Sequence, residues 1–332
     1  SRGLGDVNKR QIIILLVVVI FLPMLIATVD LGGLLIEGLG PILESLEPLI
    51  PGEWFPLYFT RVYLQRPLIA SLVVSMVAGF MGTFLLMRNL ALIGDGLAHV
   101  SFGAIAVALA IGWAPLKFAL IICVTSALII EFLSEKGYLT GDSAIAIFLT
   151  GMLGLGLVVS YVSGDSAIRQ IDGYLWGNLN LIDAESFNNI IWVSLISYIT
   201  LAILYRSLLA ICIDPIASQV QGIPVFLITI IWSTLIAVVV VSMVQIVGAL
   251  LVTALIVTPA AMAQLTSRSF FMCVVLSQIF GIITVLLGLY YSAELGTGSG
   301  SMIALVSAVL FVVIALTKGV VKMFTATNQN TN

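Results

Sequence analysis

Long apolar runs dominate this chain of 332 residues, and each is about as long as a helix must be to cross a lipid bilayer. Hydrophobic residues make up 61% of the sequence and charged residues 9%, and the mean hydropathy is +1.22. Soluble domains carry roughly 25% charged residues. Because a helix satisfies its own backbone hydrogen bonds in lipid, the runs predict an all-α, polytopic helical membrane protein.

A hydropathy window of about 19 residues places the candidate spans. Two of the predicted hairpins are so tight that the count is about nine to ten transmembrane helices. The predicted spans cover residues 11–29, 68–87, 91–112, 115–134, 143–163, 189–206, 225–243, 245–264, 270–291 and 301–317.

The basic residues favour one orientation of these spans. With the N-terminus in the cytoplasm, nine lysines and arginines fall in cytoplasmic positions and four in external ones. Because cytoplasmic loops are enriched in these residues, we expect a multi-pass protein of the cell membrane with both termini cytoplasmic. The chain then divides into an N-terminal span with an acidic external loop (1–66), a core of spans (67–317) and a cytoplasmic tail (318–332).

Acidic residues gather on the predicted external side, which holds ten of the 16. An acidic face raises the local concentration of cations and suits the basic patches of a partner; a simply solvated loop explains the same residues. Within the loop, Gly38–Leu49 has the apolar spacing of a short amphipathic helix on the membrane surface. No basic patch or low-complexity tail points to nucleic acid as a partner.

The single histidine, His99, follows Asp95 by one helical turn, in a run from Asn89 to Leu116 without other charges. Residues four apart share one face of a helix. Ionisable groups are costly in lipid, so this pair should face the protein interior. A carboxylate and an imidazole on one face make half of a divalent-metal site. The alternative is a structural brace, in which Asp95 bonds His99 or nearby backbone groups.

Two further segments carry patterns with more than one interpretation. Asp214 can cap a short helix that begins at Pro215, and Gly222 can end that helix before Pro224. Such a helix suits a groove in a cytoplasmic partner, and an ordinary capped connector has the same pattern. Gly248–Ala263 is rich in small residues around a proline, which indicates pore lining and close helix packing equally well.

These motifs together resemble the membrane permease of zinc/manganese ABC importers. Met81–His99 contains the glycine-aspartate-x-x-x-histidine pattern of that family, and the similarity covers roughly residues 63–317. The resemblance assigns ATPase coupling to Asp214, Pro215, Ala217 and Gly222, and a proline-alanine-alanine pathway helix to Gly248, Pro259, Ala260 and Ala261.

The resemblance implies a type II-like importer permease. Two permease copies, for example a homodimer, would form the pathway, with ATP-binding cassette ATPase subunits below and an extracellular metal-binding protein above. Asp95 and His99 would be transient ligands of transported Zn²⁺ or Mn²⁺, with no permanently bound cofactor. The sequence contains no Gly-x-x-x-x-Gly-Lys-Ser/Thr loop, so we expect the chain not to be an enzyme and ATP hydrolysis to belong to a partner.

Two other function classes compete with this interpretation. A secondary cation transporter would use the Asp95–His99 pair as an ion or proton relay. The broken half-repeats that are typical of such folds are not evident. An intramembrane metalloenzyme is disfavoured because one histidine without a His-Glu-x-x-His motif leaves its metal with too few ligands.

Overall fold

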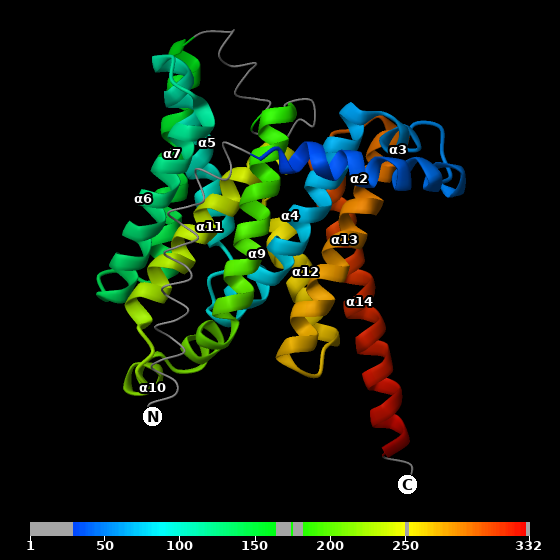
Figure 1. Cartoon of the computed structure of the whole chain (residues 1–332). Helices are drawn as coiled ribbons and strands as arrows, with labels where there is room; N and C mark the ends of the chain where they lie inside the picture. The colour runs from blue at the N-terminus through cyan, green and yellow to red at the C-terminus, as the bar shows by residue number, and fades with distance from the viewer. Residues whose placement is uncertain (1–28, 164–173, 175–181, 250–251, 330–332) are drawn as a thin grey trace.

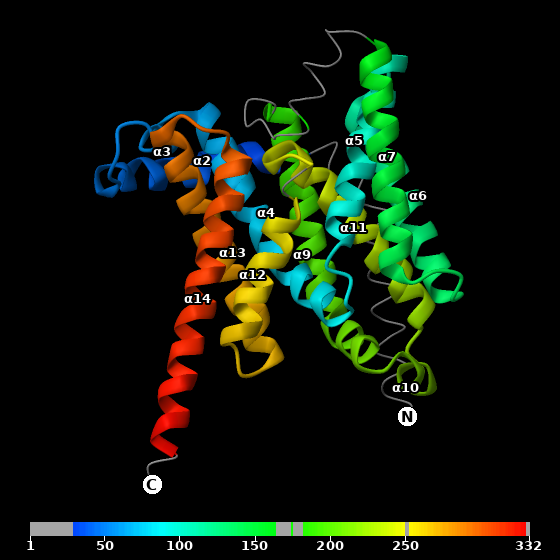
Figure 2. The same cartoon turned by 180° about the vertical axis from the view of Figure 1, so that it is seen from behind.

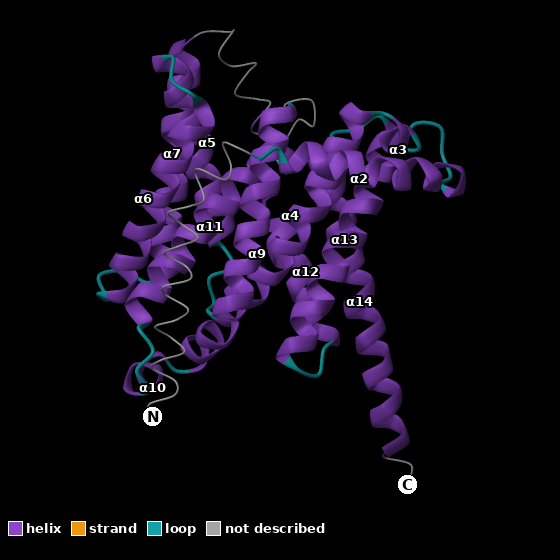
Figure 3. Ribbon diagram, in the orientation of Figure 1, coloured by secondary structure: helices purple, strands orange, loops and turns teal. Residues whose placement is uncertain are grey.

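The structure is a computed structural model that describes residues 29–163, 174, 182–249 and 252–329. This part of the chain is built from helices, turns and loops and contains no strand (Figure 3). Eight of its helices are long and apolar enough to cross a membrane. The predicted all-α, polytopic fold is therefore confirmed, whereas the predicted span 11–29 lies outside the described residues.

The long helices run between two ends of the molecule (Figure 1). They are α4 (Val62–Met87), α5 (Ile93–Ile111), α6 (Pro115–Glu135), α7 (Gly141–Ser163), α9 (Ala184–Ile213), α11 (Val225–Val247), α13 (Phe270–Leu295) and α14 (Ser299–Gln329). The shorter elements are α2 (Leu31–Leu46), the 3-10 turn η1 (Glu47–Leu49), α3 (Leu57–Thr60), α10 (Pro215–Val220) and α12 (Val252–Thr266). We call the two ends the α2 end and the α10 end.

Two groups of helices meet along a seam (Figures 1 and 2). In the first group, α5 packs on α6 and α7, and α6 packs on α11. In the second group, α4 packs on α9, α12 and α13, and α14 packs on α12 and α13. Helix α11 and the start of α12 supply most of the smaller contacts between the groups. We call this boundary the seam.

Helix α4 is the most buried span, which explains its apolar residues on all sides. In its most apolar stretch 83% of the residues are buried, compared with 17% in α7 and in α14. A helix that is apolar all round must be surrounded by other helices or by lipid. Helices α7 and α14 therefore offer broad apolar faces to lipid or to another chain.

Close packing around α4 depends on glycines. A Cβ atom on Gly82 would overlap the carbonyl oxygen of Ile256 and lie 3.1 Å from the Cβ of Ala260, so the backbones of α4 and α12 approach each other closely. The neighbouring Gly79 accepts a 2.8 Å hydrogen bond at its carbonyl from the Ser277 hydroxyl on α13. Small residues give membrane helices this kind of close approach.

The segments that precede α4, namely α2, η1 and α3, pack at the α2 end. Both carboxylate oxygens of Glu294, on α13, accept backbone N–H hydrogen bonds of 2.9–3.1 Å from Glu53, Trp54 and Phe55. The amphipathic helix predicted over Gly38–Leu49 is present, but it begins earlier, at Leu31, and ends in η1. It runs crosswise to the long helices and packs on α9 and α4 (Figure 1).

The predicted span 245–264 is wrong in its extent. Helix α11 continues to Val247, and Gly248 ends it with a φ of 86°, a backbone conformation that favours glycine. Helix α12 then starts at Val252 and has only 15 residues. The predicted span 189–206 is also too short, because α9 runs past Arg206 to Ile213.

Replacing Gly82 by alanine should destabilise the folded protein by about 1–3 kcal/mol, because the new methyl group overlaps the backbone of α12. Thermal unfolding in detergent measures the effect. Gly151→Ala in α7 is the matched control, since a Cβ there has nothing within 4 Å and alanine favours a helix. Equal melting temperatures for the two variants would contradict the packing described here.

Candidate functional site

Asp95 lies in the first turn of α5, where that helix meets the start of α12. The Thr253 hydroxyl, in the first turn of α12, donates a 2.5 Å hydrogen bond to Asp95 Oδ1. The neighbouring Gly94 also lies against α12, since a Cβ there would be 3.5 Å from Thr253 Oγ1, an ordinary contact distance. The N-terminal turn of a helix also stabilises a carboxylate. Asp95 is thus held across the seam, between the two groups of helices.

His99 lies one turn further along α5 and is 7% exposed. Its Nδ1 atom is buried and has no hydrogen-bond partner among the described residues. A buried polar atom without a partner is costly and calls for an explanation, such as an ion that binds there. No hydrogen bond joins Asp95 to His99 in the described part of the chain, so the structure contains no brace between these two side chains.

The pair is an incomplete ligand set within one chain. Among the described residues, no group of three or more histidine, cysteine, aspartate or glutamate side chains could hold a metal ion together. Asp95 supplies oxygen and His99 supplies nitrogen, donors that suit several transition metals. A zinc-like site needs four ligands. The remaining donors would have to come from a second chain, a partner or water.

The residues predicted for a pathway helix do not lie together. Gly248 terminates α11, whereas Pro259, Ala260 and Ala261 belong to α12. Pro259 and Ala260 are buried, and Ala260 packs toward Gly82 of α4. Helix α12 reaches the Asp95–His99 pair through Thr253, which the sequence analysis did not select.

Helix α10 has the local structure that the sequence predicts. The Asp214 carboxylate accepts hydrogen bonds from the backbone N–H of Ile216 (2.9 Å) and Ala217 (3.0 Å), and Pro215 occupies the first helical position. Gly222 follows with a φ of 84°. This capping and the positive φ are what fix so short a helix.

The outward face of α10 is apolar. Ile216 is 75% exposed and Val220 is 86% exposed, one turn apart on the same face. Ser218 on the opposite face is buried. This exposed apolar pair suits a contact with another protein or with the lipid surface.

An ion pair between spans was missed by the sequence analysis. Arg88 Nη2 lies 3.0 Å from Glu131 Oε1, and the Ser233 hydroxyl donates a 3.1 Å hydrogen bond to Glu131 Oε2. The signal was present, because an acid near the end of an apolar span needs a partner. Arg88 is one of the nine basic residues that the predicted orientation places in the cytoplasm.

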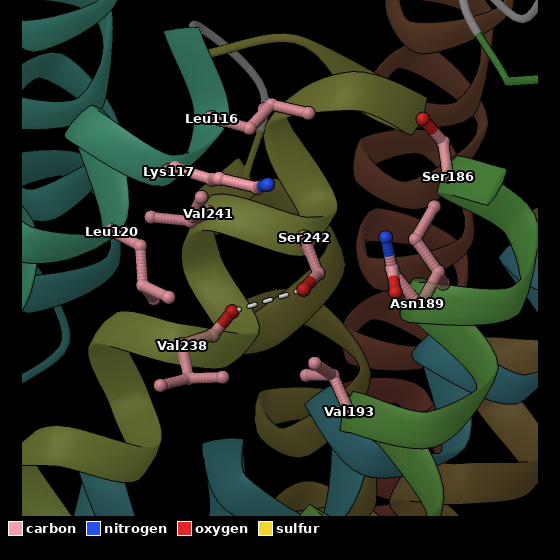
Figure 4. Close-up of a pocket in the computed structure, with 10 residues that line it drawn as sticks. Leu116, Lys117, Leu120, Ser186, Asn189, Val193, Val238, Val241 and Ser242 are labelled. Carbon is pink, nitrogen blue, oxygen red and sulfur yellow. Dashed lines mark hydrogen bonds between the residues drawn. The ribbon is translucent and has the colours of Figure 1, made fainter. Parts of the chain in front are cut away.

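A separate cavity of about 240 Å³ lies between α6, α9 and α11 (Figure 4). Leucine, isoleucine and valine side chains form most of its wall, and Lys117 extends along one side (Figure 4). The Ser242 hydroxyl faces it but donates to the Val238 carbonyl at 3.0 Å. An ammonium group in an apolar wall repels cations, so this cavity does not suit a metal ion.

Comparison with known proteins places this arrangement in a family. Residues 61–318 match the model of the ABC 3 transport family. The chain is 31% identical over 249 residues to the manganese transport system membrane protein MntC of Halalkalibacterium halodurans, covering 75% of this chain and 85% of that protein. It is 25% identical to the chelated iron transport system membrane protein YfeD of Yersinia pestis, covering 77% of this chain and 85% of that protein.

A solved structure agrees with the fold. PsaBC from Streptococcus pneumoniae, in complex with Fab, superimposes with a TM-score of 0.68 and 28% sequence identity, covering 76% of this chain and 91% of the other. Together with the helical arrangement described above, the family match shows that the chain belongs to the ABC 3 transport family as a membrane permease for metal-ion import.

Proposed function

We propose that this permease imports Mn²⁺, and that Asp95 and His99 are the transient ligands of the ion. The observation that carries the proposal is the buried, unpartnered Nδ1 of His99, one turn from a carboxylate held at the seam. The names of the relatives favour Mn²⁺, while the donor set is also compatible with Zn²⁺. Family membership disfavours the alternative of a secondary cation transporter.

The pathway in this proposal lies between two copies of the chain. One copy supplies one carboxylate and one imidazole, so two copies supply up to four ligands. The broad apolar faces of α7 and α14, in each of which 17% of the most apolar stretch is buried, are the surfaces available for such an assembly. An external metal-binding protein would deliver the ion at the α2 end.

Energy for transport would come from ATP-binding cassette subunits bound at the α10 end. The exposed pair Ile216 and Val220 on a rigidly capped helix supports this contact, because it presents a short apolar ridge for a groove in the ATPase. Asp214, Pro215, Ala217 and Gly222 would act by fixing the shape of that ridge. The chain itself would move the ion and hydrolyse no ATP.

Replacing His99 by alanine or Asp95 by asparagine should reduce Mn²⁺ uptake at least about tenfold, because each variant removes a ligand from both copies. Uptake of radioactive Mn²⁺ into proteoliposomes that contain the permease with its ATPase measures the loss. Thr125→Ala is the control, since the Thr125 hydroxyl bonds only within its own helix, to Ile121. Normal uptake in both ligand variants would disprove the proposal.

The metal itself is tested by adding Mn²⁺, Zn²⁺ or Fe²⁺, each with the metal-binding protein, to the same complex. We expect Mn²⁺ to stimulate ATP hydrolysis most in the unaltered protein and stimulation to disappear in His99→Ala. Stronger stimulation by Zn²⁺ would reassign the substrate and leave the site unchanged.

The double change Ile216→Asp and Val220→Asp should abolish co-purification of the ATPase subunits, because two carboxylates would replace the apolar contact. Gln219→Ala, on the same helix at an exposed position, is the control. A normal melting temperature shows that the permease remains folded. Unimpaired ATPase binding by the double variant would favour the ordinary connector.

A cysteine at Gln219 should react with an impermeant thiol reagent only after cells are opened, and a cysteine at Glu44 should react in intact cells. The reason is that the α10 end is cytoplasmic in the orientation that the basic residues favour. Both positions are exposed. The unaltered protein controls for its own three cysteines. The opposite labelling pattern would invert the topology.

A further inference from the structure

The ion pair of Arg88 and Glu131 crosses the seam. Arg88 follows the last residue of α4, in the second group, and Glu131 lies on α6 in the first group. Their side chains are 21% and 15% exposed, and no other salt bridge occurs among the described residues. Ser233 of α11 bonds the second carboxylate oxygen, so both oxygens of Glu131 have a partner. We call Arg88, Glu131 and Ser233 the latch.

Arg88, on one side of the latch, is connected to the Asp95–His99 pair by a short, hydrogen-bonded turn. Leu90 N donates to the Leu85 carbonyl at 2.9 Å, and Ile93 N donates to the Leu90 carbonyl at 3.2 Å. Asn89 closes the turn with a φ of 55°. Helix α5 begins directly afterwards, with Asp95 in its first turn. A displacement of Arg88 therefore moves the start of the helix that carries both ligands.

The other side of the latch is connected to α10. Ile223 N donates to the Ser218 carbonyl at 3.0 Å, and Val225 N donates to the Ile223 carbonyl at 2.8 Å, which ties α10 to the start of α11. Ser233 lies about two turns into α11. The adjacent Trp232 packs edge-on against Phe84 of α4, with ring centroids 5.9 Å apart. Helix α11 thus contacts both Glu131 and α4, the helix that Arg88 follows.

We propose that the latch transmits movement of α10 to Asp95 and His99, and that Glu131, Arg88 and Ser233 are positioning residues for transport. This inference rests on the proposed function, since it assumes that α10 responds to the ATPase. A pair of charges away from water is held strongly only while both partners face each other. In this proposal the latch is either closed or separated, and separation releases the α4–α5 turn from Glu131 of α6.

The decisive measurement is the amount of Mn²⁺ transported per ATP hydrolysed in proteoliposomes that contain the complete importer. Glu131→Gln and Arg88→Gln should each lower this ratio about tenfold while ATP hydrolysis continues. The exchanged pair, Arg88→Glu with Glu131→Arg, should recover most of the loss. Ser233→Ala should lower the ratio by a smaller factor, and Ser242→Ala, whose hydroxyl bonds only within α11, should leave it unchanged.

A purely structural role makes a different prediction. In that case the single variants would show a lower melting temperature and yield, and those molecules that fold would transport the normal amount of Mn²⁺ per ATP. That result would overturn the inference. So would failure of the exchanged pair to recover transport in a protein of normal stability, because the latch requires opposite charges and not particular residues.

A second readout does not depend on the metal. A cysteine at Leu92, a 49% exposed position in the α4–α5 turn, should change its reactivity toward a thiol reagent when ATP binds to the complex. The change should disappear in Glu131→Gln. The same change in parent and variant would refute the latch, whatever ion is transported. Absence of Mn²⁺ transport in the parent, with the nucleotide-dependent change still present, would count against the proposed substrate alone.

Discussion

The absence of hydrogen-bond partners in a bilayer is the constraint on which the rest of this structure depends. Most hydroxyl groups in the spans meet it within their own helix, as Thr83 does by donating to the Phe80 carbonyl at 2.8 Å. Carboxylates have no donor and cannot do so. Asp95 and Glu131 therefore bond to hydroxyl or guanidinium groups on other elements. The bonds from Thr253 to Asp95 and from Arg88 to Glu131 join the two groups of helices across the seam.

The same constraint explains which parts of the fold could be predicted. Length and apolarity were enough to predict the eight long helices, because a segment that crosses a bilayer must satisfy its own backbone hydrogen bonds and a helix does so. Length and apolarity did not predict the helix end at Gly248. There the apolar sequence is continuous, but a φ of 86° ends α11 before α12 begins. The end of α9 was also predicted too early, at Arg206. The long side chain of Arg206 can place its charge at the membrane surface while the helix continues.

The candidate site was predictable in part for a related reason. Asp95 and His99 are conspicuous because each is ionisable in an apolar run, and spacing along one helix relates them. Thr253 is one of many threonines in apolar segments. Its contact with Asp95 depends on the packing of α5 against α12, because the two residues are 158 positions apart in the sequence. Glu131 and Arg88 are 43 positions apart, on helices whose pairing no local pattern specifies. Tertiary contacts of this kind are invisible to hydropathy.

The incompleteness of the Asp95–His99 pair bears on mechanism in a way that a complete site would not. A closed four-ligand zinc site binds with roughly 10–16 kcal/mol, which makes release too slow for a transporter. In the proposed importer, two donors per chain would form a weaker half-site whose affinity depends on the distance between the two halves. Small movements at the seam would then change ion affinity by changing the distance between the half-sites. The Thr253 bond orients the Asp95 carboxylate at the seam. The unpartnered nitrogen of His99 is the group whose environment an arriving ion would change most.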